Sequence, residues 1–206
     1  MKLTRYGHSC VLVEDGHGRV LLDPGIFSTG FEDLRGLTGV LITHQHPDHL
    51  DVDRVTRLLD SNPEAVLVTD EGSQLDLPRS VAHAGDSFEL GLSVTVHGSD
   101  HAVIHPDLPG VPNVGYLVGG RFFTPGDALT VPDADVEVLG LPTDAPWLKL
   151  VEAVQLLRDV KPARAFPVHD GVLNAAATGI WYGHFDRLGP DGTAFSPVVA
   201  GESMEL

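Results

Sequence analysis

The sequence predicts an α/β protein in which two β-sheets pack on each other and helices lie outside them. Short apolar runs separated by Gly, Asp and Pro dominate roughly the first 140 residues, and such runs are typical of strands joined by turns. Two stretches, one within this region and one after it, place apolar residues at the spacing of an α-helix. The order of strands, helix, strands, helix, strand and helix fits this layered architecture.

The expected strands follow one another with clear turn signals between them. Asp15–Gly18 has the sequence Asp-Gly-His-Gly and indicates a hairpin turn. Val40–Ile42 is entirely apolar, as strands buried on both faces are. The expected strands are Leu3–Tyr6, Cys10–Glu14, Val20–Asp23, Val40–Ile42, Val66–Val68, Leu92–His97, Gly115–Val118, Arg121–Thr124, Val136–Leu139 and Ala163–Phe166.

Three helices are expected outside the sheets. The first spans Asp51–Asp60 and carries an apolar face. The second spans Trp147–Val160, and Pro162 stops it because proline cannot continue a helix. Asp144 lies just before this helix and is expected to cap it. A third helix, Leu173–Leu188, is expected from a weaker pattern.

Length and composition indicate one globular domain with an ample core. The 206 residues contain 42% hydrophobic and 20% charged residues, which is ordinary for a globular protein. No repeat or low-complexity linker interrupts the chain, so we expect a single domain over residues 1–206. We find no apolar signal segment at the amino terminus and no run near the roughly 20 apolar residues of a membrane span. We therefore expect a cytoplasmic protein.

The charge balance narrows the range of partners. The chain has 29 acidic and 13 basic residues, which gives a net charge of −16 with His neutral. Nucleic acids and anionic membranes require clustered Lys and Arg, so we expect neither, and a small-molecule substrate fits better. A homo-oligomer stays open. The single cysteine, Cys10, excludes an internal disulfide and is expected in the core.

The most informative segment is His44-Gln45-His46-Pro47-Asp48-His49. It packs three imidazoles and a carboxylate into six residues directly after the buried strand Val40–Ile42. Zinc, iron and manganese accept these ligands. His44 and His46 are two residues apart, so both rings can face one ion in an extended loop. Asp48 and His49 are adjacent and point differently, which suits a second ion nearby.

Later strand ends bring further ligand types. His97 and His101 both follow the strand Leu92–His97 closely enough for one ring to reach the metal loop. Asp127 follows a glycine at the next strand end, and a carboxylate there can bridge two cations with its two oxygens. His169 follows the strand Ala163–Phe166. Each position alone is weak evidence, but their combination with the first cluster indicates a metal site.

This pattern resembles the metallo-β-lactamase superfamily, whose members carry His-x-His-x-Asp-His, then a distant His, a Gly-Asp pair and a final His. The resemblance covers residues 1 to about 175 and implies an αββα four-layer sandwich with one or two metal ions at the sheet edges. Gly7–Cys10 and Leu21–Gly25 resemble the small bacterial branch of metal-dependent hydrolases that includes ascorbate-6-phosphate lactonase.

The resemblance also implies an assignment of ligands. His101 is preferred to His97 because it follows a glycine-containing turn, although the family commonly has Pro-Gly-His there and this chain has Asp100 before the histidine. The first ion would be held by His44, His46 and His101. The second ion would be held by Asp48, His49 and His169, and Asp127 would bridge the two.

The expected activity is metal-dependent hydrolysis of a small ester, lactone, amide or phosphoester by a metal-bridging hydroxide. Two cations roughly 3.5–4 Å apart can share a water, lower its pKa toward about 7 and polarise the electrophile. Asp48 would ligate one ion and orient the hydroxide. His8 is a candidate for protonating the leaving group, because its segment resembles the amino-terminal motif of that branch. Two zinc ions are expected, and manganese or iron fits the same ligands.

Other residues have two readings each. His97 and His105 either support ligands or are ordinary loop residues, whereas His17 and His83 are expected to be structural or to face solvent. Tyr116 either lines the cleft, with Asn113 and Gly115, or packs in the core. The aromatic segment Trp181–Phe185 either covers a pocket or, as we favour, packs a helix on the sheet. The scattered cations available for an anionic substrate are Arg5, Arg121 and Lys149.

Two alternative functions remain open from the sequence. An iron-dependent oxidoreductase resembling the sulfur dioxygenases has a similar ligand set on the same fold. Diiron members usually have an acid where this chain has His46, which disfavours that variant. A non-catalytic metal-binding protein is the third reading, and the intact ligand set argues against it.

Overall fold

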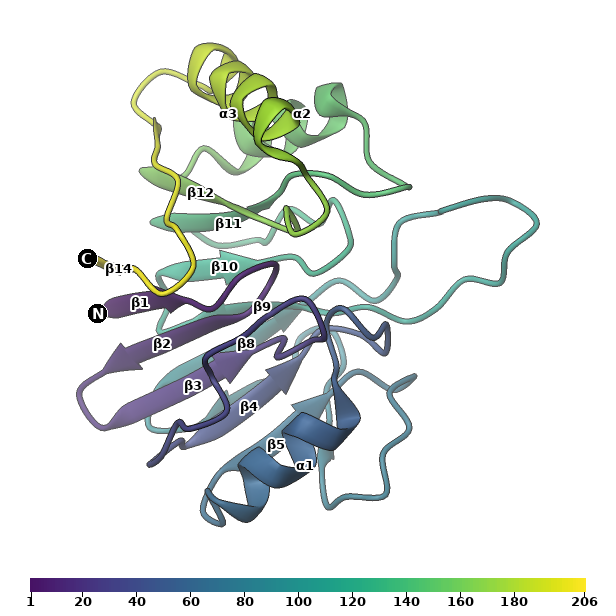
Figure 1. Ribbon diagram of the computed structural model, residues 1–206, viewed down its shortest axis with the longest axis vertical. Coiled ribbons are helices and arrows are strands. Elements are labelled where there is room, and N and C mark those ends of the chain that lie inside the picture. The colour runs from purple at the N-terminus through teal and green to yellow at the C-terminus, as the bar shows by residue number, and fades with distance from the viewer.

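Two seven-stranded sheets pack face to face in the computed structural model, which describes all 206 residues (Figure 1). The order in the first sheet is β14 (Ser203–Glu205), β1 (Lys2–Arg5), β2 (Val11–Asp15), β3 (Gly18–Leu22), β4 (Gly39–Ile42), β5 (Val66–Thr69) and β6 (Ser80–Val81). The order in the second is β13 (Ala194–Phe195), β12 (Arg164–Val168), β11 (Val138–Pro142), β10 (Phe122–Thr124), β9 (Gly115–Val118), β8 (Ser93–His97) and β7 (Ser87–Glu89).

Helices cover the outer face of each sheet and complete four layers. Helix α1 (Val52–Asp60) packs Val55 and Leu58 onto the first sheet. Helices α2 (Leu150–Val160) and α3 (Ala175–Leu188) lie together on the second sheet (Figure 1). The expected αββα sandwich is therefore confirmed. None of the three helices is long and apolar enough to cross a membrane.

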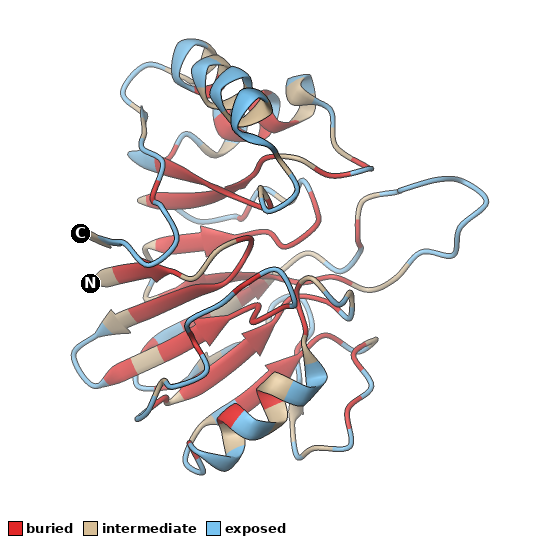
Figure 2. Ribbon diagram, in the orientation of Figure 1, coloured by how far each residue is buried: buried red, intermediate tan, exposed pale blue.

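The main core lies between the two sheets, where Figure 2 shows the strands largely buried. It contains 20 buried residues, among them Val13 and Leu41 from the first sheet and Phe122 and Phe166 from the second. Two smaller cores lie between each sheet and its helices. Cys10 is fully buried in the core under α1, as expected from its position in the sequence. Close packing in these cores holds the strand ends of the two sheets in a fixed position relative to each other.

Most expected elements are present, and the differences have local causes. The hairpin turn is confirmed, since Asp15 pairs with Gly18. Strands β6, β7, β13 and β14 were not expected, because two or three residues are too few to show an alternating pattern. Helix α2 begins at Leu150 rather than at Trp147. Lys149 precedes its first turn, and the Glu152 side chain accepts a hydrogen bond from the Lys149 amide at 2.8 Å. The prediction that Asp144 caps this helix was wrong.

Strand direction brings five chain segments to one edge of the sandwich. In the first sheet β1 and β4 run the same way, because β1 is antiparallel to β2, β2 to β3, and β3 is parallel to β4. In the second sheet β8, β10 and β12 share a direction for the same reason. The residues that follow these five strands are His8, His44, His101, Asp127 and His169.

Candidate metal centre

Side chains from both sheets converge at this edge in two groups of four, and the candidate ligand atoms within each group lie within 4.8 Å of one another. The first group is His44, His46, His101 and Asp127, and the second is His8, Asp48, His49 and His169. The structure thus brings together all seven residues predicted as ligands, and it adds His8, which was predicted as a proton donor.

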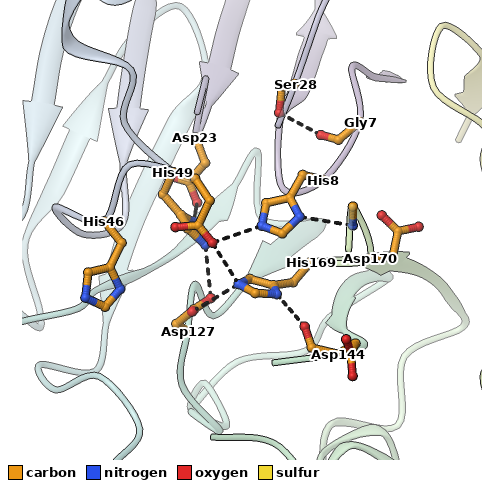
Figure 3. Close-up of polar contacts among 12 residues, drawn as sticks. Gly7, His8, Asp23, Ser28, His46, His49, Asp127, Asp144, His169 and Asp170 are labelled. Carbon is orange, nitrogen blue, oxygen red and sulfur yellow. Dashed lines mark hydrogen bonds and ion pairs between the residues drawn. The ribbon is translucent and has the colours of Figure 1, made fainter. Parts of the chain in front are cut away.

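Asp127 lies between the two groups. Its Oδ2 is 3.4 Å from His101 Nε2 and 3.9 Å from His44 Nε2, both in the first group. The same carboxylate lies 3.0 Å from His49 Nε2 through Oδ1 and 3.2 Å from His169 Nε2 through Oδ2. Figure 3 shows Asp127 facing His49 and His169. A carboxylate in this position can serve ions in both groups.

The buried donor atoms fit divalent cations. His49 Nε2, His101 Nε2, His169 Nε2 and Asp127 Oδ1 are buried and have no hydrogen-bond partner of proper geometry. Buried polar atoms without partners are rare and costly. Imidazole nitrogens and carboxylate oxygens are the ligands that zinc, manganese and iron accept. The unpartnered atoms of this chain are therefore suited to holding such ions.

The opposite nitrogen of each ring is fixed by an oxygen acceptor. His49 Nδ1 lies 2.8 Å from Asp23 Oδ2, His169 Nδ1 lies 2.6 Å from the Asp144 carbonyl oxygen, and His101 Nδ1 lies 2.5 Å from the Ala102 carbonyl oxygen. Each acceptor holds a proton on Nδ1, so that the deprotonated Nε2 of the neutral ring would face a cation, which is the usual support of a metal-binding histidine. Asp144 thus acts through its backbone.

Asp23 is a functional residue that the sequence reasoning missed. It is fully buried, and it accepts hydrogen bonds from the Thr43 amide and hydroxyl, each at 2.8 Å, as well as from His49. Gly25 follows closely, and a side chain there would overlap the Asp48 backbone. The Asp-Pro-Gly sequence after β3 carried the signal, because β3 is the parallel neighbour of β4, and His44 follows β4.

His8 is held by hydrogen bonds on both ring nitrogens (Figure 3). Its Nδ1 accepts from the Gly171 amide at 3.1 Å, and its Nε2 lies 3.2 Å from Asp48 Oδ2. Because Nδ1 is an acceptor, the neutral ring carries its proton on Nε2 and donates it toward Asp48. Burial lowers the pKa of His8, which favours this neutral form. His8 is therefore arranged as a hydrogen-bond donor beside a candidate ligand.

Backbone strain is concentrated at this site. Four non-glycine residues have a positive φ, and three of them are His8 (44°), Asp23 (44°) and His169 (56°). The fourth, Lys161, ends helix α2. Left-handed backbone at non-glycine residues costs about 1–3 kcal/mol each and persists where the surrounding structure enforces it, commonly at functional sites. The fold imposes these three conformations to orient the side chains.

The charges within the centre compensate one another. Burial alone would raise the pKa of Asp127 and of Asp48, but neighbouring histidines lower both well below their usual range. Burial lowers the pKa of His44 well below its usual value, so this ring is neutral. Burial also disfavours charge on His169, but its contacts with Asp127 and Asp48 raise its pKa to about 9. Without metal, His169 is therefore protonated at neutral pH.

Proton release should accompany metal binding. A ligand nitrogen must be deprotonated, so a cation that binds His169 at pH 7.5 displaces a proton, and the apparent affinity should rise with pH until about pH 9. We expect the calorimetric heat of zinc binding to metal-free protein to vary with the ionisation enthalpy of the buffer. The contribution of His169 to this dependence should shrink above pH 9. Heats that are the same in all buffers at pH 7.5 would contradict this charge state.

Asp127 is positioned by two residues from outside the ligand set. Asn113 is fully buried, and its side-chain oxygen accepts from the Asp127 amide at 2.9 Å. The Trp147 indole Nε1 donates to Asp127 Oδ2 at 3.0 Å. Gly126 has a φ of 64°, and a side chain there would collide with Asn113 and Thr43. Glycine is therefore required for packing against these neighbours as well as for the turn.

Trp147→Phe should weaken metal binding. The change keeps most of the apolar bulk of a largely buried side chain but removes the hydrogen bond to Asp127. Partners of this type are worth about 10–100-fold in metal affinity or activity, and we expect a loss in that range, measured by chelator competition. Trp181→Phe is the matched control, because the Trp181 indole nitrogen has no hydrogen-bond partner. Equal affinities in both variants would exclude a positioning role.

Several other residues lie away from the centre. His97 contacts Thr95 and Phe123 instead, and the side chains of His83 and His105 are 61% exposed beside acidic neighbours. His17 is exposed in the hairpin turn, as expected. Tyr116 is a core residue whose hydroxyl donates to the Ile42 carbonyl oxygen at 2.9 Å. The metal assignment of His101 over His97 is thus consistent with their positions.

The cations considered for an anionic substrate are all paired. Arg121 pairs with Glu137, and Lys149 is exposed beside Glu152. Arg5 is buried and pairs with Asp170, which also accepts from the Tyr182 hydroxyl at 2.6 Å. Arg5 additionally donates to the His8 carbonyl oxygen at 3.2 Å. Arg5 therefore supports the His8 turn.

Comparison with known proteins agrees with this geometry. The family model described as the beta-lactamase superfamily domain matches residues 2–169. Protein Rv0786c of Mycobacterium tuberculosis is 49% identical over 196 residues, which cover 91% of this chain and 92% of that protein. A UPF0173 metal-dependent hydrolase of Mesorhizobium japonicum is 30% identical over 60% of this chain and 45% of its own length.

A solved structure has the same fold. The structure of Igni18, a metallo hydrolase from Ignicoccus hospitalis, superposes with a TM-score of 0.70 at 17% identity. The match covers 100% of this chain and 98% of that protein. At this identity the likeness concerns the fold alone, and the chemistry must be argued from the residues of this chain.

Proposed function

The chain belongs to the beta-lactamase superfamily. We propose that it is a metal-dependent hydrolase with two divalent cations in its centre. The proposal rests on one observation above all, which is the set of buried, unpartnered ligand atoms around Asp127. Zinc is the first candidate, and manganese or iron fits the same donors. The relative named as a metal-dependent hydrolase supports this class of activity.

The proposed ligand roles follow from the two groups. His44, His46 and His101 would hold one cation, and Asp48, His49 and His169 the other, with Asp127 shared. When bound, two such cations lower the pKa of a shared water and polarise the oxygen of an electrophile. Asp23 keeps His49 in the required tautomer, and Trp147 keeps Asp127 in place.

His8 is proposed to serve the leaving group. Its Nε2 proton points toward Asp48 at the border of the second group, and its Nδ1 is occupied by the Gly171 amide. A neutral, donor-oriented imidazole can protonate a departing oxygen or nitrogen. Asp48 would then have two tasks, since it is a candidate ligand and the acceptor that aims His8.

The expected substrate is a small carboxylic ester, lactone or amide. The centre has no free Lys or Arg to neutralise a phosphate, because Arg5 is engaged by Asp170 and the other candidate cations lie in surface pairs. Recognition of phosphate normally uses such cations. A phosphoester therefore fits this site less well than a neutral substrate.

Metal analysis and activity assays together test the proposal. We expect purified protein to bind two equivalents of zinc or manganese and to hydrolyse neutral esters or lactones without oxygen. Strict dependence on oxygen, with iron as the only active metal, would instead support the oxidoreductase reading. Stoichiometric metal binding with no turnover of esters, lactones, amides or phosphoesters would leave a metal-binding protein. The metal-free protein is the control in each assay.

A further inference from the structure

An apolar pocket opens directly beside the first ligand group. Its volume is about 370 Å³, and its walls are His46, His101 and the residues from Ala102 to Val111 except Asp107. This segment belongs to the loop between β8 and β9, which extends away from the sheets (Figure 1) and is mostly exposed (Figure 2). The volume falls in the range of sites that hold small molecules, roughly 300–1,000 Å³.

The walls of this pocket carry no Asp, Glu, Lys or Arg side chain. The loop contributes Val103, Ile104 and Leu108, of which Val103 is 73% exposed and Leu108 is 55% exposed. Isolated exposed apolar residues are ordinary, but a cluster that lines a pocket next to a reactive centre marks a binding surface. In a chain with net charge −16, such a neutral wall favours an uncharged, apolar occupant.

A second hollow lies on the other side of the centre and has different chemistry. It measures about 400 Å³, and its walls combine Arg5, His8, Asp170 and Tyr182 with apolar residues such as Phe27. The proposed proton donor, His8, therefore lines a hollow that also contains charged and hydroxyl side chains, whereas the first ligand group lines a pocket without Asp, Glu, Lys or Arg. Since the donor must lie beside the departing group, the part of the substrate that keeps the carbonyl carbon is directed toward the apolar pocket.

We propose that this apolar pocket binds the acyl chain of a neutral ester, lactone or amide. The inference rests on the proposed hydrolase function and names its substrate class. In the reaction, the oxygen of water bonds to the carbonyl carbon and the bond from that carbon to the leaving oxygen or nitrogen breaks. A proton passes to the leaving group, and the products are a carboxylic acid and an alcohol or amine.

A series of p-nitrophenyl esters tests the pocket without depending on His8, because p-nitrophenolate leaves without protonation. We expect kcat/KM of the zinc-loaded protein to rise about fourfold per added methylene from acetate until the pocket is filled. In Ile104→Ser, the ratio of octanoate to acetate kcat/KM should fall at least tenfold. Val151→Ser is the matched control, since Val151 is 69% exposed on α2, and its ratio should match the unaltered protein.

A binding measurement separates failure of the pocket from failure of the hydrolase function. Methyl NMR signals of Val103, Ile104 and Leu108 should shift with octanoate and much less with acetate, in zinc-loaded protein. Shifts of this kind without turnover of any substrate would keep the pocket and overturn the hydrolase. Ester turnover that is independent of chain length, without methyl shifts, would overturn the pocket. A third outcome is loss of self-association in Ile104→Ser together with a kcat/KM that does not depend on acyl-chain length. This result would make the loop a contact surface between copies of the chain, and it would also overturn the proposed acyl pocket.

Discussion

Asp127→Ala is expected to lower bound metal from two equivalents to about one and to reduce turnover by a factor of about 10² or more. The reason is that this carboxylate contacts candidate ligands of both groups, namely His44 and His101 in one and His49 and His169 in the other. Without it, the remaining histidines of the two groups repel when protonated, and the second activating charge is lost. The first group retains three histidines, which suffice for one ion.

Elemental analysis after gel filtration decides the outcome for Asp127. Asp133→Ala is the control, because Asp133 is an exposed acid outside both groups, and it should keep two equivalents and full turnover. Circular dichroism of the metal-free variants shows whether each one folds. Two equivalents retained by a folded Asp127→Ala would refute the shared ligand.

The centre joins the two sheets. His44, His46, Asp48 and His49 follow β4 of the first sheet, whereas His101, Asp127 and His169 follow strands of the second. Each group in the structure contains residues from both sheets. A cation held in either group would therefore tie the sheets together at their edge, so that metal binding and packing of the sandwich would reinforce each other. The His8 turn, fixed by Arg5 and Gly171, closes the same edge.

The candidate ligand set was predictable because its residues follow strands with strong patterns and match the motif of the superfamily that the sequence resembles. The fully apolar β4 identifies the loop that begins at His44, and parallel strands place the later ligands at one edge. By contrast, Asp23 and Asn113 act on partners 26 and 14 residues away through hydrogen bonds. The Asp-Pro-Gly sequence marks Asp23 as a residue at a strand end, but the spacing of these residues along the chain does not indicate which partners they contact. These contacts depend on which strands are neighbours within each sheet, since Asp23 and His49 follow the paired strands β3 and β4 and Asn113 and Asp127 flank the paired strands β9 and β10.

Trp147 shows how a local pattern misleads. Its spacing with Leu150 and Val154 fits a helix, so the sequence places it on the face packed against the sheet. The helix instead begins at Leu150, and the freed indole turns to Asp127. The short edge strands were missed for a related reason. Strand β14 is defined by its pairing with β1, with Met204 opposite Leu3, rather than by a pattern of its own.

His8→Ala is expected to keep two equivalents of metal but to slow hydrolysis of esters with alcohol leaving groups by about 10²–10⁴-fold. His8 donates from Nε2 toward Asp48 and receives the Gly171 amide at Nδ1, so its proton rather than a lone pair faces the centre. A poor leaving group such as an alkoxide needs that proton. A p-nitrophenyl ester does not, and its turnover should change little.

The comparison of leaving groups separates the roles that His8 can have. Metal loss in His8→Ala would make it a ligand or the direct support of one, since it lies within the second group. Equal slowing of alkyl and p-nitrophenyl esters would mean that His8 only positions Asp48. His17→Ala is the matched control, because His17 is exposed in the hairpin turn and should leave both rates unchanged. Selective slowing of alkyl esters with full metal content is the result that assigns the proton donor.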